Sequence, residues 1–136
     1  MKVFISHAYT DEPFVRKVAT GLEKVGLEVW DATREILPGD NWADKVARAL
    51  KESEAMVVLL TPDALRSSWV HWEIQYALGE QSYRNRLIPV LVGDPEELPK
   101  EDVPWILRRL QMINMGEYDK EEEGIDQIAQ TLLEAA

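Results

Sequence analysis

The feature that most restricts the fold is the segment Ala55–Leu60, which reads AMVVLL and contains no polar residue. A strand with one face in water alternates polar and apolar side chains, whereas a strand covered on both faces stays apolar throughout. Residues 87–92 read LIPVLV and are equally apolar, and Pro89 within them favours a position near the sheet edge. Two such runs predict a parallel sheet with helices on both faces.

Strand and helix patterns alternate along the rest of the chain. The other predicted strands lie at residues 2–6, 27–30 and 112–115, and the predicted helices at residues 14–25, 42–50, 67–78, 105–110 and 121–133. Residues 31–40 and the acidic residues 93–104 have neither period and are predicted to be loops. This alternation predicts an α/β fold: a flavodoxin-like, five-stranded parallel sheet in the order 2-1-3-4-5, formed by residues 1–136 as one domain.

Composition excludes several classes of function. The 136 residues carry 25 acidic and 15 basic side chains, a formal net charge of -10, so direct nucleic-acid binding is not expected. No apolar run approaches the roughly 18 residues of a membrane span, and the start of the chain turns polar too quickly for a signal peptide. The lack of cysteine excludes disulfides and agrees with a reducing compartment, so a cytoplasmic location is expected. Because the first predicted strand begins at Lys2, a sensor domain is expected to follow Ala136 or to belong to a separate protein.

Residues 67–78, SSWVHWEIQYAL, place a single carboxylate among large aromatic side chains. On a helix, Trp69, Trp72 and Tyr76 lie close to Glu73, on a face that adjoins the apolar stripe. Glu73 is therefore expected at the border of the core, where its replacement should hardly change folding stability. A carboxylate in this place is either an ordinary surface residue or a group held for a purpose.

The predicted strand order says where a ligand site would lie. In doubly wound sheets, ligands bind beyond the carboxyl ends of the strands, where the strand order reverses. Here that point lies between the first and third strands. The segments expected to line it are residues 7–11, residues 30–40 and the stretch from Leu60 to Glu73. Three separate segments are thus predicted to converge on Glu73.

Other candidate residues have a structural and a functional interpretation. Trp30 ends a strand and either stacks on a substrate or packs in the core, whereas Trp72 is expected in the core or an interface. Trp42 is expected to serve packing or self-association. His7 directly follows the first strand, but no second histidine or cysteine beside it supplies a nucleophile. His71 is expected at the surface, and the sequence has no metal-ligand spacing and no glycine-rich phosphate loop.

Three motifs, VFISHA at residues 3–8, DATREILPGD at residues 31–40 and SSWVHWE at residues 67–73, together resemble a Toll/interleukin-1 receptor (TIR) domain. The resemblance covers nearly the whole chain. Trp69, four residues before Glu73, is similar to the pattern of TIR domains that cleave NAD+, including bacterial immune enzymes. The resemblance implies an NAD+ glycohydrolase in bacterial anti-phage signalling, which takes NAD+ as substrate without a cofactor. Its products would be nicotinamide and ADP-ribose or a cyclic isomer.

The same resemblance implies roles for individual residues. Glu73 would be catalytic, and no metal ligand is implied. The residues implied in substrate binding are His7, Ala8, Trp30, Asp31, Arg34 and Trp69. The residues implied in self-association with other TIR domains are Ile36, Leu37, Pro38 and Gly39. From the residues alone, Ile36 and Leu37 are either both exposed at a loop tip or both folded back under it.

A single carboxylate is chemically sufficient for this reaction. Nicotinamide leaves NAD+ as a neutral base, so no acid has to protonate it, in contrast to glycosidases that need two carboxyl groups. What remains is to stabilise an oxocarbenium-like ribose and to hold its hydroxyls, and Glu73 can do both. The aromatic faces of Trp69 and Trp30 suit a planar, cationic nicotinamide.

Three other functions stay open at this point. The first is a non-catalytic TIR assembly or adaptor module that uses residues 31–40 for contacts. The second is an enzyme similar to nucleoside deoxyribosyltransferases, which also use a glutamate at a ribose. The third is a phosphoacceptor receiver, which has the same strand order. A receiver needs an aspartate at the end of the third strand, where this chain has Leu60, Thr61 and Pro62.

Overall fold

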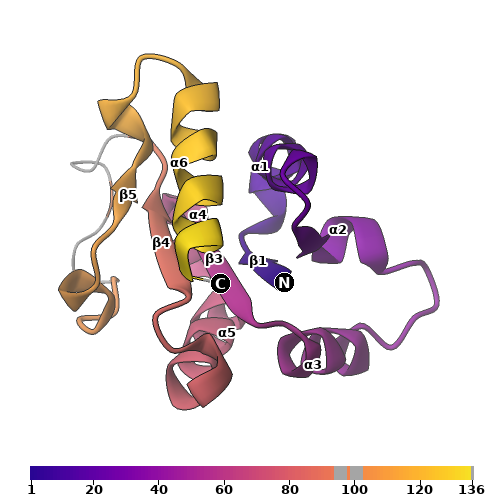
Figure 1. Cartoon of the computed structure of the whole chain (residues 1–136). Helices are drawn as coiled ribbons and strands as arrows, with labels where there is room; N and C mark the ends of the chain where they lie inside the picture. The colour runs from indigo at the N-terminus through magenta and orange to yellow at the C-terminus, as the bar shows by residue number, and fades with distance from the viewer. Residues whose placement is uncertain (94–97, 99–102, 136) are drawn as a thin grey trace.

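The computed structural model describes residues 1–93, 98 and 103–135, and a five-stranded parallel sheet forms its centre (Figure 1). The strand order is β2-β1-β3-β4-β5, which confirms the predicted doubly wound, flavodoxin-like arrangement. All four pairs of neighbouring strands are parallel. The strands are β1 (Lys2–Ser6), β2 (Glu28–Trp30), β3 (Ala55–Leu60), β4 (Leu87–Leu91) and β5 (Ile113–Asn114).

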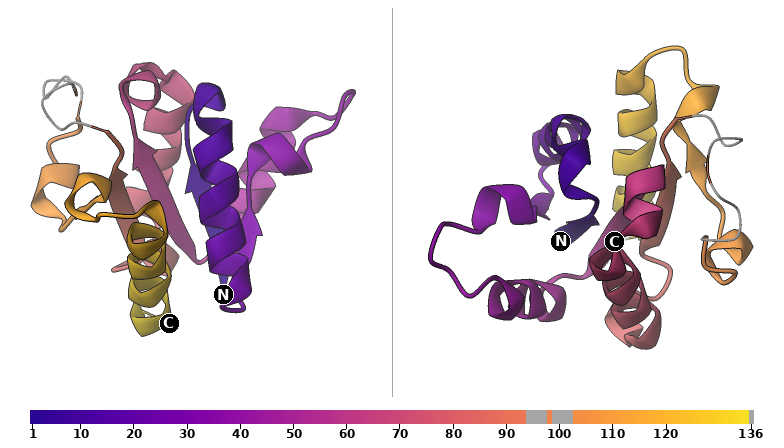
Figure 2. Two further views of the ribbon diagram at one scale, coloured as in Figure 1. Left: turned by 90° about the horizontal axis from the view of Figure 1, so that it is seen from above. Right: turned by 180° about the vertical axis from the view of Figure 1, so that it is seen from behind.

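Helices cover both faces of the sheet, as Figure 2 shows from two further directions. Helices α1 and α6 lie side by side on one face, and α3, α4 and α5 cover the other. The helices are α1 (Glu12–Lys24), α2 (Ala32–Glu35), α3 (Trp42–Glu52), α4 (Pro62–Arg66), α5 (Ser68–Gly79) and α6 (Glu121–Ala135), with short 3-10 turns η1 (Tyr9–Asp11), η2 (Gln81–Tyr83), η5 (Leu107–Arg109) and η6 (Met115–Glu117).

The central strand β3 serves both cores at once. Met56, Val58 and Leu60 pack under α3, α4 and α5, whereas Val57 and Leu59 pack under α1 and α6. Successive side chains of a strand point to opposite faces, so each face of β3 contributes to one core. Neither face meets water, which is why the run AMVVLL contains no polar residue.

Pro89 lies in an inner strand but beside the sheet edge. It is opposite Val58 of β3. Among the described residues, β5 pairs only with Val90 and Leu91 of β4, beyond Pro89. A proline without a backbone N–H is tolerated there because β5 requires no hydrogen bond from it. The position near the edge agrees with the interpretation of the sequence.

Two segments differ from the predicted elements. Residues 31–40 are not wholly a loop, because the side chain of Asp31 accepts a hydrogen bond from the backbone N–H of Thr33 and so starts the short helix α2. The predicted helix at residues 105–110 is reduced to the turn η5, in which Leu107 is buried. The predicted acidic loop at residues 93–104 lies mostly outside the described residues.

None of the helices within the described residues is both long and apolar enough to cross a lipid bilayer. The 15-residue helix α6 carries three glutamates in its first turn alone.

The contact between α1 and α6 generates a stability prediction. A Cβ atom added to Gly21 of α1 would collide with the side chain of Ile125 in α6, which is buried and branched at Cβ. We expect Gly21→Ala to lower the free energy of unfolding by about 1–2 kcal/mol, because overpacking outweighs the helix propensity gained. The control is Gly79→Ala in α5, where a Cβ meets no atom within 4 Å and stability should stay unchanged or rise slightly. Urea unfolding measures both variants, and equal stabilities would contradict the close packing of α1 on α6.

Candidate functional site

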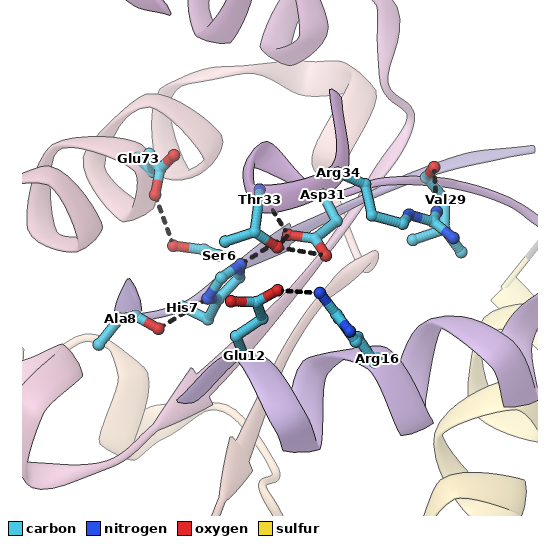
Figure 3. A network of polar contacts seen from close by, with 10 residues as sticks. All are labelled: Ser6, His7, Ala8, Glu12, Arg16, Val29, Asp31, Thr33, Arg34 and Glu73. Carbon is cyan, nitrogen blue, oxygen red and sulfur yellow. Dashed lines mark hydrogen bonds and ion pairs between the residues drawn. The ribbon is translucent and has the colours of Figure 1, made fainter. Parts of the chain in front are cut away.

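The candidate site lies at the carboxyl end of β1, where three segments of the chain meet (Figure 3). Ser6 is the last residue of β1, His7 follows it, Asp31 follows β2, and Glu73 comes from α5. The Ser6 hydroxyl Oγ donates a hydrogen bond of 2.8 Å to Oε1 of Glu73. The ring nitrogen Nε2 of His7 lies 2.8 Å from Oδ1 of Asp31. The convergence predicted from the strand order is therefore present.

Local sequence sets the start of α5 and hence the place of Glu73. The hydroxyl of Ser67 caps α5 by accepting a hydrogen bond from the backbone N–H of Val70. Val70, Ile74 and Ala77 are buried in the core against the sheet. Because Glu73 comes three residues after Val70 and four before Ala77, its side chain lies on the same face of the helix and enters the packed layer above Ser6.

Glu73 is buried, with 8% of its surface exposed, so the expectation of a residue at the border of the core was wrong. A helix pattern shows which face is apolar, but it does not show that β1, β3, α3, α4 and η2 all contact α5. Burial raises the pKa of Glu73 to about 7, although the hydrogen bond from Ser6 and the charge of His7 both lower it. Near neutral pH this carboxyl is partly protonated and partly ionised, which is typical of ionisable residues at functional sites.

His7 is held between two oxygen acceptors. Its Nδ1 lies 2.8 Å from the carbonyl oxygen of Ala8, and its Nε2 faces the carboxylate of Asp31. A neutral imidazole has one N–H, so only the doubly protonated ring can donate to both oxygens. Burial lowers the pKa of His7, but the hydrogen bonds to Asp31 and Ala8 and the nearby negative charges outweigh burial, and the net shift is upward. The doubly protonated form of His7 is therefore the one that satisfies both oxygens, and it leaves neither ring nitrogen free.

Asp31 is fully buried, and its side chain binds both His7, which follows β1, and the first turn of α2. Its Oδ1 accepts hydrogen bonds from the backbone N–H and the hydroxyl of Thr33, at 3.1 and 2.9 Å, as well as the one from His7. Burial raises its pKa, but the hydrogen bond and charge of His7 and the bonds from Thr33 outweigh burial and lower it. His7 and Asp31 were both candidates from the sequence, but their pairing was not predicted. The signal was available, since neighbouring parallel strands end at the same edge of a sheet.

Trp30 and Arg34, both implied in substrate binding, make their main contacts with residues other than Glu73. Trp30 is 9% exposed and stacks on Phe4, with ring centroids 5.0 Å apart and an interplanar angle of 14°. The structure thus favours the core-packing interpretation of Trp30. Arg34 pairs with Glu23 at 2.7 Å and points away from Glu73 (Figure 3). The geometry supports neither residue as a ligand contact at Glu73.

Trp69 lies one helical turn before Glu73 and is 41% exposed. Its ring meets Trp42 of α3 edge-on at a centroid distance of 4.1 Å, and Trp72 at 5.5 Å. Trp42 and Trp72 are also partly exposed. The three indoles form a continuous aromatic row next to the candidate site. The contact between Trp42 and Trp69 was not predicted from the sequence, because they come from different helices.

His71, which was expected at the surface, is half-buried. Its Nε2 lies 2.6 Å from the carbonyl oxygen of Leu65.

The loop implied in self-association divides its apolar pair. Ile36 packs against the core, whereas Leu37 is 61% exposed. The expectation that both side chains are exposed, or that both fold back under the loop, was wrong. Pro38 and Gly39 are exposed as well, and Gly39 adopts a φ of +90° that favours glycine. In both views of Figure 2 the loop between α2 and α3 extends away from the body of the domain.

Little of the surface of Glu73 is exposed in this arrangement. Prominent pockets on the described part of the chain lie between α1 and α6, beside Trp30 and Arg34, and along β5, and none of these is lined by Glu73 or His7. No cluster of three or more His, Asp or Glu side chains among the described residues could hold a metal ion.

The burial of Glu73 generates a prediction about stability and pH. Below its ordinary pKa of 4.5 the carboxyl is protonated in both states; between 4.5 and about 7 the unfolded chain loses the proton first, so stability falls as pH rises. Relative to the parent, Glu73→Gln should gain up to about 3 kcal/mol across this interval. Guanidinium unfolding at both ends of the interval measures the change, with Glu80→Gln at the exposed end of α5 as control. A stability difference that does not vary with pH would contradict the burial of an ionisable Glu73.

Comparison with known proteins agrees with this geometry. A family model described as the TIR domain matches residues 3–129. The stimulator of interferon genes protein of Magallana gigas is 31% identical over 115 residues, which cover 82% of this chain and 27% of that protein. The 2' cyclic ADP-D-ribose synthase AbTIR of Acinetobacter baumannii is 30% identical over 87 residues, which cover 63% of this chain and 32% of that protein. The chain thus spans about a third or less of the length of these curated relatives.

A solved structure supports the same assignment. The metazoan TIR-STING receptor from C. gigas, in complex with 2',3'-cGAMP, superposes with a TM-score of 0.76 at 28% identity. The match covers 96% of this chain and 38% of that one. Since the family model also matches nearly the whole sequence, the chain belongs to the TIR-domain family.

Proposed function

We propose that this TIR domain cleaves NAD+ to nicotinamide and either ADP-ribose or a cyclic isomer, as a step in bacterial anti-phage signalling in the cytoplasm. The observation that carries the proposal is the Glu73 carboxyl, buried over the end of β1 with a pKa of about 7. The relative from Acinetobacter baumannii, named as a 2' cyclic ADP-D-ribose synthase, supports the class of substrate.

In the proposed reaction the bond between ribose C1′ and nicotinamide N1 breaks, and its electron pair leaves with nicotinamide, which becomes neutral. Positive charge develops on the ribose, where an ionised Glu73 stabilises it. Water then bonds to C1′ and releases a proton, which gives ADP-ribose. An atom of the adenine ring in place of water gives a cyclic isomer. Because Glu73 acts on charge alone, no second carboxyl group has to donate a proton.

Trp69 supplies the aromatic face for the cationic nicotinamide. It is the implied binding residue whose ring is both next to Glu73 on α5 and partly exposed. The edge-on contact with Trp42 holds the Trp69 ring in place. His7 and Asp31 are buried and paired with each other, so they act near the Glu73 carboxylate through their charges and not by direct contact with NAD+.

Access to Glu73 is proposed to depend on self-association through residues 36–39. Leu37 is exposed on a projecting loop, and an exposed leucine favours burial against a partner. That partner is another TIR domain, within the same assembly as any sensor that controls it. Movement of the loop on contact uncovers the site, as lids do in other enzymes. A single chain is then weakly active.

A second candidate function is a non-catalytic assembly module. The burial of Glu73 supports this alternative, because a carboxyl that is buried and hydrogen-bonded to Ser6 is also compatible with a purely structural role. Nicotinamide release from NAD+ by the assembled protein separates the two functions.

The first test of the proposed function is Glu73→Gln. Losing one preorganised electrostatic group should lower turnover of NAD+ by about 100-fold or more, near 3 kcal/mol in activation free energy. Nicotinamide release is followed under crowding conditions that induce assembly, and circular dichroism verifies the fold. The matched control is Glu80→Gln, which changes an exposed glutamate at the end of the same helix and should keep parental activity. Near-full cleavage by a folded Glu73→Gln protein would contradict the assignment.

The second test concerns assembly. Specific activity should rise with protein concentration and with added salt, because the net charge of -10 repels chains and about 0.1 M salt screens charges beyond about 10 Å. Leu37→Asp and Gly39→Pro should abolish the rise. Leu133→Asp, which changes an exposed leucine on α6, is the control and should preserve it. Activity per molecule that stays flat with concentration, and survives both loop substitutions, would show that one chain holds a complete site.

A further inference from the structure

Two consecutive residues at the carboxyl end of β1 act on the Glu73 carboxylate, Ser6 through a hydrogen bond and His7 through its charge. We propose that Ser6 and His7 are positioning residues for Glu73, Ser6 by fixing one carboxylate oxygen and His7 by holding a buried positive charge beside it. The proposal rests on the proposed function only for its consequence in catalysis. The arrangement itself is a property of the folded chain and can be tested without substrate.

Ser6 divides the two carboxylate oxygens of Glu73 into different roles. Ser6 is fully buried, and its hydroxyl donates to Oε1 over 2.8 Å. Among the described residues no other group donates to this carboxylate. In the same part of the chain the one fully buried side-chain polar atom without a partner is Ser53 Oγ, so the unpaired Oε2 of Glu73 still reaches the surface. Oε1 is thus anchored, and Oε2 is the oxygen left to accept a ribose hydroxyl.

His7 acts on Glu73 through charge and not through a hydrogen bond. Both ring nitrogens are already used, one by the Ala8 carbonyl and one by Asp31. The side chains of His7 and Asp31 are 4% and 0% exposed, so this pair cannot rotate toward solvent without breaking. The ring therefore cannot donate a proton to a leaving group. What it supplies to Glu73 is a fixed positive charge.

The ionisable groups of the other elements around α5 are exposed or already paired, so Ser6 and His7 have the main influence on the ionisation of Glu73. From η2, Tyr83 is buried, and its hydroxyl is committed to the carbonyl oxygen of Leu50 at 2.6 Å. The charged residues of α4, Asp63 and Arg66, are exposed. On α3 most charged residues are exposed, and the partly covered Lys45 is paired with Asp40 at 2.8 Å. Within the described residues, Ser6 and His7 are the groups that oppose the burial of Glu73.

The first experiment measures the carboxyl directly. The protein is labelled with glutamate carrying carbon-13 in the side-chain carboxyl, and the Glu73 signal, assigned by its absence in Glu73→Gln, is followed with pH. Ser6→Ala should move the midpoint upward by about one pH unit, because a hydrogen bond to a charged group is lost. Ser6→Thr should restore it, and Ser82→Ala, at an exposed serine of η2, should leave it unchanged. A Ser6→Ala midpoint equal to that of the parent would overturn the role of Ser6.

The role of His7 needs a variant that leaves no unpaired buried charge. His7→Gln combined with Asp31→Asn removes the cation and its counter-ion together and keeps groups able to hydrogen-bond. We expect the Glu73 midpoint of this double variant to rise. Asp31→Asn alone is the second measurement if the double variant does not fold: it removes the carboxylate that favours the charged form of His7, and above the pKa of His7 in that variant the Glu73 midpoint should rise. A Glu73 midpoint unchanged in a folded variant that has lost the His7 charge would overturn the role of His7.

The pH profile of NAD+ cleavage then tests the consequence for catalysis. Turnover by the parent should rise with pH as Glu73 ionises, and in Ser6→Ala this rise should move upward with the carboxyl midpoint. At pH values above both midpoints, the remaining loss of kcat reports the orientation supplied by Ser6, whereas KM should change little. A parental profile in Ser6→Ala would contradict the positioning role even if cleavage occurs. Absence of cleavage in the parent would instead reject the proposed function and leave the carboxyl titration to decide the positioning role.

Discussion

The structure depends on covering both faces of β3. Its six residues are buried, so one helical layer must lie on each side of the sheet, and the strands that flank β3 run parallel to it. Parallel strands bring all of their carboxyl ends to one edge. The constraint that buries apolar side chains therefore also gathers Ser6, His7 and Asp31 in one place, with Glu73 above them.

At that edge the chain removes ionisable groups from water and satisfies them to different degrees. Burying a charge without a partner costs several kcal/mol, roughly, and the His7–Asp31 pair offsets this by mutual attraction and by hydrogen bonds to Ala8 and Thr33. Glu73 has one hydrogen bond and one nearby cation, and burial still outweighs both, which leaves its pKa at about 7. The folded structure stabilises the charges of the His7–Asp31 pair, whereas burial of the Glu73 carboxylate lowers the free energy of unfolding. Such an imbalance is typical of functional sites.

Burial links the exposure of Glu73 to its charge. Burial is the largest cause of the raised pKa of Glu73, so any movement that lets water reach the carboxyl also favours its ionised form. The loop between α2 and α3 projects from the domain and carries the exposed Leu37. Its neighbour Ile36 packs against the core, so the loop joins an exposed apolar side chain to a buried one. Exposure of Glu73 to water and its ionisation are therefore physically linked.

The sequence by itself determined the sheet, its strand order and the edge at which a site would form, because these follow from the local spacing of apolar residues and from the rules of parallel strands. It also selected Glu73, His7, Asp31 and Trp69. Only the tertiary structure decided how these residues are used. The spacing within one helix reports its apolar face but not how many neighbours cover it, so the burial of Glu73 was missed.

Contacts between distant segments could not be predicted from the sequence for a related reason. His7 and Asp31, or Trp42 and Trp69, meet because whole elements are packed, and no local pattern states which side chains then touch. The same holds for Trp30, whose place at a strand end suited a ligand or the core until its ring was found on Phe4. Local spacing determines elements and their order, whereas burial and pairing depend on the sum of all contacts in the folded chain.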